Sequence, residues 1–125
     1  MKITSFNPIV ATAHCEEVVK LFEDLGFEKR HSIENIDNTG INAIDMKNED
    51  GFRVDVGDVK QLPQDMMFIR MNVDNFEEAY DILIKHGFKN SRGDETVDSK
   101  SSKAASMISP SGFAISLVQH IKDHD

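Results

Sequence analysis

The chain has 125 residues, with 14 basic and 22 acidic side chains and a formal net charge of −8 at pH 7. Such a negative charge argues against nonspecific binding to phosphate backbones, which excludes nucleic acid as a partner. No apolar run approaches the ~20 residues of a membrane span, and the N-terminus lacks the apolar core of a secretory signal. The single cysteine, Cys15, cannot form an internal disulfide. We expect a soluble, cytoplasmic protein.

The first half of the chain predicts one helix among strands. Pro8 suggests an edge or strand-end position in the first strand. Apolar residues then recur at helical spacing, and Gly26 is suited to end the helix. The apolar side of that helix is expected to hold Cys15, Val18, Val19, Phe22 and Leu25. In chain order, the expected elements are a strand at 3–12, this helix, and strands at 28–36, 41–47 and 52–57.

A segment of the predicted helix returns later in the chain. The sequence EEVVKLFEDLGF at 16–27 is followed, 61 residues on, by EEAYDILIKHGF at 77–88. The same offset aligns further residues without a gap, and eight identities fall between residues 16 and 52. The additional matches are Ala43 with Ala104, Met46 with Met107, and Gly51-Phe52 with Gly112-Phe113. This pattern indicates two copies of one βαβββ module.

The repeat fixes the expected organisation of the second half. Asp74 or Asn75 is expected to cap the second helix, which Gly87 ends. The charged segment 91–103 predicts a mobile loop, with a lid over a site as one interpretation. Further strands are expected at 67–73 and 113–119. We therefore divide the chain into a module at 1–57, a linker at 58–65, a module at 66–120 and a tail at 121–125.

These residues resemble the vicinal oxygen chelate superfamily, which includes glyoxalase I, bleomycin-resistance proteins and extradiol dioxygenases. The pieces LFEDLGF and SPSGFAISL stand where that family commonly has an LGF-like helix end and a DPDG-like turn before a strand. The resemblance covers nearly the whole chain. It implies an α+β fold in which two βαβββ modules form a cupped mixed sheet with the helices on the convex face. One fold hosts many functions, so the resemblance says less about activity.

In metal-dependent members of this family, one ligand lies on the first and one on the last strand of each module. Carried over to this chain, the four positions are Asn7, Asp55, Phe68 and Ser116. Phe68 cannot ligate a cation, and neutral Asn and Ser are poor ligands beside His and Glu. Only Asp55 remains plausible. We therefore predict no metal and no other cofactor.

Strand parity predicts a polar face on the side of the sheet away from the helices. If Phe52, Val54, Val56, Phe113, Ile115 and Leu117 pack beneath the helices, alternate residues face the concave side. That side then holds Asn7, Arg53, Asp55, Phe68, Arg70, Asn72 and Ser116. Such a set would suit a planar or anionic organic ligand. Two structural alternatives remain open, in which Arg70 simply pairs with Asp55 or lies in a dimer interface.

We interpret the chain as a small-molecule-binding protein of the bleomycin-resistance type, without a catalytic metal and with an anionic or aromatic ligand. The alternative is a glyoxalase-like lyase or a dioxygenase with a displaced metal site. A third reading is a structural dimer without a ligand. A homodimer is expected because edge strands need partners. His31 lies on a strand whose parity the sequence leaves open.

Overall fold

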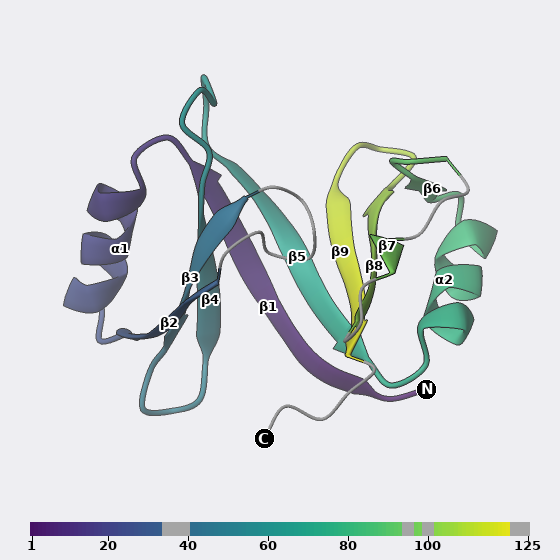
Figure 1. The fold of residues 1–125 in the computed structure, drawn as a ribbon, viewed down its shortest axis with the longest axis horizontal. Helices are drawn as coiled ribbons and strands as arrows, with labels where there is room; N and C mark the ends of the chain where they lie inside the picture. Colours follow the sequence, from purple (N-terminus) through teal and green to yellow (C-terminus); the bar gives the residue numbers. More distant parts are fainter. Residues whose placement is uncertain (34–40, 94–96, 99–101, 121–125) are drawn as a thin grey trace. The chain divides into compact units, whose positions relative to one another are not determined.

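Two βαβββ copies make up the chain, the second with one additional short strand. The computed structural model describes residues 1–33, 41–93, 97–98 and 102–120. The first copy comprises β1 (Ile3–Thr12), α1 (Cys15–Asp24), β2 (Glu28–Ile33), β3 (Asn42–Lys47) and β4 (Arg53–Asp58). The second comprises β5 (Met66–Val73), α2 (Phe76–Lys85), β6 (Lys89–Asn90), β7 (Val97–Asp98), β8 (Ser102–Ile108) and β9 (Ala114–His120) (Figure 1). The predicted α+β class and the two modules are confirmed. The tail predicted at 121–125 lies outside the described residues.

The chain divides into two compact units, which we call the first unit (residues 7–67) and the second unit (residues 1–6 with 68–125). In the first unit the strand order is β2-β3-β4-β1, and in the second it is β5-β9-β8-β6, with β7 paired to β8. Each set of strands contains parallel and antiparallel pairs: β1 runs parallel to β4 and β5 parallel to β9, while β3 is antiparallel to β4 and β8 to β9. The registers also match: Ile9 pairs with Asp55, and Arg70 with Ser116, each 61 residues on. The repeat therefore extends to strand pairing.

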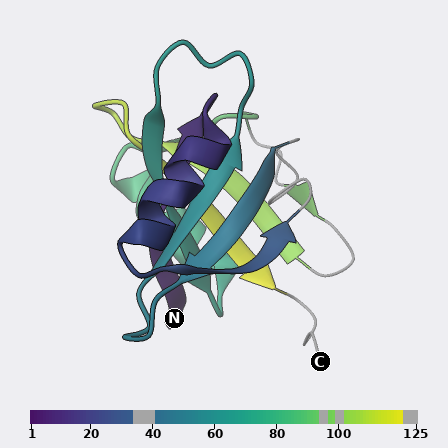
Figure 2. The ribbon, with the colours of Figure 1, turned by 90° about the vertical axis from the view of Figure 1, so that its left-hand side faces the viewer.

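In the first unit, α1 packs on one face of the sheet (Figure 2). Cys15 lies against this core, as predicted, and burial raises the pKa of its thiol, assisted by the carboxylates of Asp58 and Glu16. The prediction for Leu25 is wrong, since its side chain is 63% exposed. The helix ends at Asp24, so Leu25 no longer continues the buried stripe. The core of this unit comprises Val10, Val19, Met46, Val54 and Val56.

In the second unit, α2 covers the corresponding face of its sheet. Asn75 caps the helix, because its side chain accepts a hydrogen bond of 3.1 Å from the Glu78 amide. Gly87 follows the helix with φ +86°, a left-handed conformation that glycine adopts without strain. The buried core comprises Met71, Val73, Phe76, Ala79, Leu83, Ala105, Met107, Ile115 and Leu117.

Three further sequence predictions need correction. Phe52 and Phe113 do not pack beneath the helices: they are 67% and 51% exposed, because each precedes the first residue of its strand. The segment 91–103 is not one continuous loop, since β7 pairs with β8 within it; residues 94–96 and 99–101 lie outside the described part. Of the strand predicted at 28–36, β2 accounts for 28–33 and the rest is likewise outside it. No helix among the described residues is long and apolar enough to cross a membrane.

Candidate functional site

In the first unit, the sheet face opposite α1 carries polar side chains. Val10, Met46, Val54 and Val56 pack with α1, and successive side chains of a strand point to opposite faces. The alternate positions of β1, β3 and β4 therefore face away from the helix, and His31 of β2 joins them because it pairs with Asp45. We call this surface the first polar face. Its polar residues are Asn7, His31, Asp45, Lys47, Arg53 and Asp55.

Asn7 and Asp55 form the most deeply buried pair of this face. The Nδ2 of Asn7 donates hydrogen bonds to Asp55 Oδ2 at 2.9 Å and to the Pro8 carbonyl oxygen at 3.1 Å. Asn7 is 4% and Asp55 1% exposed, so water has little access to replace the amide as a donor. The hydrogen bond offsets part of the cost of burying the carboxylate.

Asp45 is a member of this face that the sequence analysis missed. It is 5% exposed and lies directly across from Asp55 on the neighbouring strand. Its Oδ2 lies 3.1 Å from His31 Nε2 and 3.8 Å from an Nη of Arg53. The side chains of His31 and Arg53 are 68% and 45% exposed. A buried carboxylate is thus bordered by an imidazole and a guanidinium that a ligand can reach.

The repeat contained a signal that would have identified Asp45. Met46 matches Met107 at the 61-residue offset, and an apolar residue shared by both copies is expected in the core. Since side chains alternate along a strand, placing Met46 in the core puts Asp45 on the opposite face. The same reasoning does not place His31. Its face follows from the pairing of His31 with Asp45 across β2 and β3, and the sequence alone does not reveal that pairing.

In the second unit, the sheet face opposite α2 holds the remaining predicted residues, and we call it the second polar face. Phe68, Arg70 and Asn72 are half-buried on β5, and their neighbours Ile69, Met71 and Val73 pack toward α2. Ser116 is buried and pairs with Arg70 across the strands. Arg70 and Ser116 each have an interaction within the protein. Among the described residues, Asn72 Oδ1 has no hydrogen-bond partner although it is buried.

The four positions that the family resemblance associates with a metal do not provide a suitable donor set. Phe68 has no donor atom, and Asn7 turns its amide nitrogen toward Asp55, where a metal would need an oxygen. Hard and borderline cations are usually held by carboxylates, imidazoles or thiolates. Among the described residues, no three His, Cys, Asp or Glu side chains come together in a group that could hold a metal. We derive no chemistry from a metal at these positions.

The chain has no match among protein-family models and none among proteins of curated function. Its fold does match solved structures. A mutant of glyoxalase I from Zea mays superimposes with a TM-score of 0.69 at 12% identity, over 98% of this chain and 45% of that one. This chain therefore spans less than half the length of that maize enzyme.

Two further solved structures are closer in length to this chain. Methylmalonyl-CoA epimerase from Mycobacterium tuberculosis superimposes with a TM-score of 0.70 at 14% identity, over 96% of this chain and 90% of that one. A glyoxalase/bleomycin resistance protein/dioxygenase superfamily member from Vibrio splendidus gives 0.64 at 14% identity, over 94% and 99% of the two chains. The fold implied by the sequence resemblance is confirmed. Activity does not follow from likeness at this level of identity.

Proposed function

We propose that the protein binds small organic ligands at the first polar face and at the second polar face, each within its own unit, and does so without a resident metal. The observation that carries this proposal is the burial of Asn7, Asp45 and Asp55 on the sheet face opposite α1. Burying carboxylates costs stability unless they are paired. The second unit has Ser106 and Ser116 at the positions of Asp45 and Asp55, so the fold itself does not need these charges.

An anionic or aromatic ligand suits the side chains that remain partly exposed. Arg53 on the first polar face is 45% exposed, and a guanidinium can bind a carboxylate or phosphate with two parallel hydrogen bonds. On the second polar face, Phe68 and Arg70 lie two residues apart on β5 and therefore point to the same side. Phe68 offers a stacking surface to the ligand.

Binding of aromatic carboxylates, measured by calorimetry, tests this proposal. Arg70→Ala is expected to weaken binding by about ten- to a hundredfold, because a charge-assisted hydrogen bond contributes roughly 1.5–3 kcal/mol. Phe68→Ala should reduce affinity but keep the preference for the carboxylate over the neutral alcohol. If Arg70 serves only the fold, Arg70→Ala lowers the melting temperature and leaves the affinity of the folded variant unchanged. That result would remove Arg70 from the site.

The absence of a resident metal is tested separately. Added Zn²⁺, Ni²⁺, Mn²⁺ or Fe²⁺ should neither raise the melting temperature nor confer glyoxalase activity, since Phe68 and Ser116 occupy two of the four ligand positions. A bound ion at a hundredfold excess over its Kd would add ~2.7 kcal/mol to the free energy of unfolding. A near-stoichiometric divalent ion in the purified protein would favour the alternative, a lyase or dioxygenase with a displaced metal site.

We further propose that the chain acts in the cytoplasm as a homodimer. Strand β2 lies at the end of the strand order, and sheet edges are commonly covered by a partner. Light scattering should give twice the chain mass at micromolar concentration. A mass equal to that of one chain across this range would refute the dimer.

A further inference from the structure

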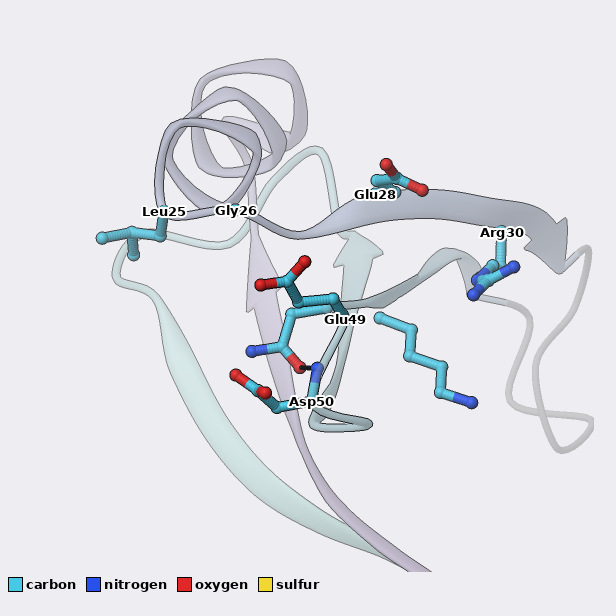
Figure 3. A pocket seen from close by; sticks show the side chains of 8 residues that line it. Leu25, Gly26, Glu28, Arg30, Glu49 and Asp50 are labelled. Atoms are coloured by element: carbon cyan, nitrogen blue, oxygen red, sulfur yellow. Dashed lines mark hydrogen bonds between the residues drawn. The ribbon is translucent and has the colours of Figure 1, made fainter.

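The first unit contains a pocket between the end of α1, the start of β2 and the hairpin that joins β3 to β4. Lys47 of its lining pairs with Arg53, so the pocket borders the first polar face at that residue. Its volume is about 460 Å³, within the range of roughly 300–1,000 Å³ common for small-molecule sites. In Figure 3, Arg30 lies at one end of the pocket and Leu25 at the other, with Glu49 and Asp50 on the hairpin between them. We call it the hairpin pocket. Its lining comprises Leu25, Gly26, Glu28, Arg30, Lys47, Asn48, Glu49 and Asp50.

The charged side chains of the hairpin pocket are not used by the fold. Among the described residues, none of the five charged side chains of the lining forms an ion pair or side-chain hydrogen bond. Asn48 differs, because its Oδ1 accepts hydrogen bonds from the Asp50 and Phe52 amides and thereby fixes the hairpin. Two cations and three carboxylates are therefore available to a ligand around one cavity.

The second unit shows what the same region looks like when it is closed. Pro110 stands at the position of Glu49, and a Cβ placed on Gly87 would lie only 2.9 Å from the Pro110 ring. Phe113 also contacts Phe88 edge to face, with ring centroids 5.5 Å apart. The hairpin of the second unit thus packs on its helix end.

The corresponding contacts are missing from the first unit. A Cβ placed on Gly26 would meet nothing within 4 Å. Phe52, at the position of Phe113, is 67% exposed, and Phe27 packs on Phe22 instead. The hairpin therefore stands away from the end of α1, and the cavity lies in the space that Pro110 and Phe113 close in the second unit.

The charges are also specific to the first unit. The positions of Arg30, Lys47 and Asp50 correspond to Ser91, Ile108 and Ser111, which are uncharged. Of the five charged positions, only that of Glu28 carries a charge in the other copy, where it is Lys89. One copy of the module has a closed and largely neutral region, and the other has an open one with both signs of charge.

We propose that the hairpin pocket binds a small zwitterion of the amino-acid class, at a site that borders the first polar face at Lys47. Arg30 and Lys47 hold the carboxylate, for which a guanidinium and an ammonium are suitable partners. Glu49 and Asp50 hold the ammonium group, and Leu25, which is 63% exposed, contacts an apolar side chain of the ligand. A zwitterion fits this lining better than a simple anion or cation, since either would meet unpaired charges of its own sign.

Calorimetric titration with leucine tests the site, with 4-methylpentanoate and isoamylamine as analogues that lack one charge each. Leucine is expected to bind, and each analogue to bind about ten- to a hundredfold more weakly, because each loses charge-assisted hydrogen bonds. No binding of leucine, or equal binding of leucine and both analogues, would overturn the proposal.

Glu49→Pro introduces into the first hairpin the residue that the second hairpin has at the same position, Pro110. The two hairpins have equivalent backbone hydrogen bonds. In the first, Gly51 N–H donates to the Asn48 carbonyl, and in the second, Gly112 N–H donates to the Ser109 carbonyl, both at 3.1 Å. Pro110 is accommodated in the second hairpin, so proline at position 49 is expected to fold and to fill the pocket. Leucine binding should then be lost.

Two charge variants keep the test independent of the proline substitution. Arg30→Ser, which introduces the residue of the second unit, should weaken leucine binding about ten- to a hundredfold. Glu23→Gln removes an exposed carboxylate of α1 outside the pocket and should leave binding unchanged. Loss of binding in the Glu23→Gln control, or full affinity in Arg30→Ser, would show that leucine binds elsewhere and refute the assignment.

Discussion

Replacing Asn7 with alanine should destabilise the protein more than most single substitutions on a sheet face. The change removes the 2.9 Å hydrogen bond from Nδ2 to Asp55 Oδ2, and Asp55 is only 1% exposed. A hydrogen bond to a charged group contributes about 1.5–3 kcal/mol, and water cannot reach the carboxylate to replace it. We expect the free energy of unfolding to fall by that amount and the melting temperature by roughly 5–15 °C.

A double-mutant cycle with Asp55→Asn separates this bond from other effects of the substitution. Asp55 has a further interaction within the protein, and the single variant Asp55→Asn accounts for its loss. In the Asn7→Ala background, Asp55→Asn should cost less than it does alone, because a neutral amide is less costly to bury unpaired than a carboxylate. Urea denaturation of the four proteins gives the coupling energy, expected at about 1–3 kcal/mol. Additive losses, or a cost of Asn7→Ala below about 0.5 kcal/mol, would refute the reasoning.

Three further predictions compare matched positions of the two copies or follow from a buried group. Phe113→Ala should lower the free energy of unfolding by at least about 0.5–1.5 kcal/mol more than Phe52→Ala, because only Phe113 has an aromatic partner; equal losses would contradict this. Asn75→Ala should lower the free energy of unfolding by ~1 kcal/mol, because it removes the cap of α2. His14 occupies the equivalent position of α1 and its side chain makes no cap hydrogen bond, so His14→Asn should raise the melting temperature. Burial raises the pKa of the Cys15 thiol in the folded state. The stability that this thiol contributes is therefore fully present below its pKa in the unfolded chain, about 8.5, and is lost as pH rises through its folded pKa. In urea titrations Cys15→Ala should lack this alkaline loss.

The fold could be predicted because the repeat supplies information that local patterns lack. Hydrophobic periodicity alone gives a helix and several short strands. The 61-residue offset adds that both halves have the same strand pairing, which the registers Ile9–Asp55 and Arg70–Ser116 bear out. Parity then placed Phe68, Arg70 and Asn72 on the side of β5 away from α2, as the structure has them.

The errors of the sequence analysis fall at the ends of elements. Leu25 continues the helical apolar stripe but lies just after the last turn of α1, where the chain direction changes. Phe52 and Phe113 fit the alternation of their strands but precede the first paired residue. Periodicity assumes that an element continues, so it misplaces side chains where the element stops.

Asp45 escaped detection for a different reason. The strand 42–47 alternates polar and apolar residues in the ordinary way for a half-exposed strand, which usually places a carboxylate in water. Its burial depends on the neighbouring strands β2 and β4, whose residues His31, Arg53 and Asp55 surround it. Tertiary context decides whether such a carboxylate is solvated or buried, and no local pattern records that context.

The duplication gives an internal measure of what the fold requires. Residues identical in the two copies serve turns, cores and first helical turns: Gly26 and Gly87, Phe27 and Phe88, Ala43 and Ala104, Met46 and Met107, Glu16 and Glu77. The first polar face and the hairpin pocket, by contrast, consist mainly of charges that the second copy replaces with neutral side chains. Two copies that fold alike with and without these charges show that folding does not demand them. Since burying a carboxylate costs free energy, the buried Asp45 and Asp55 of the first copy accord with the ligand binding that we propose.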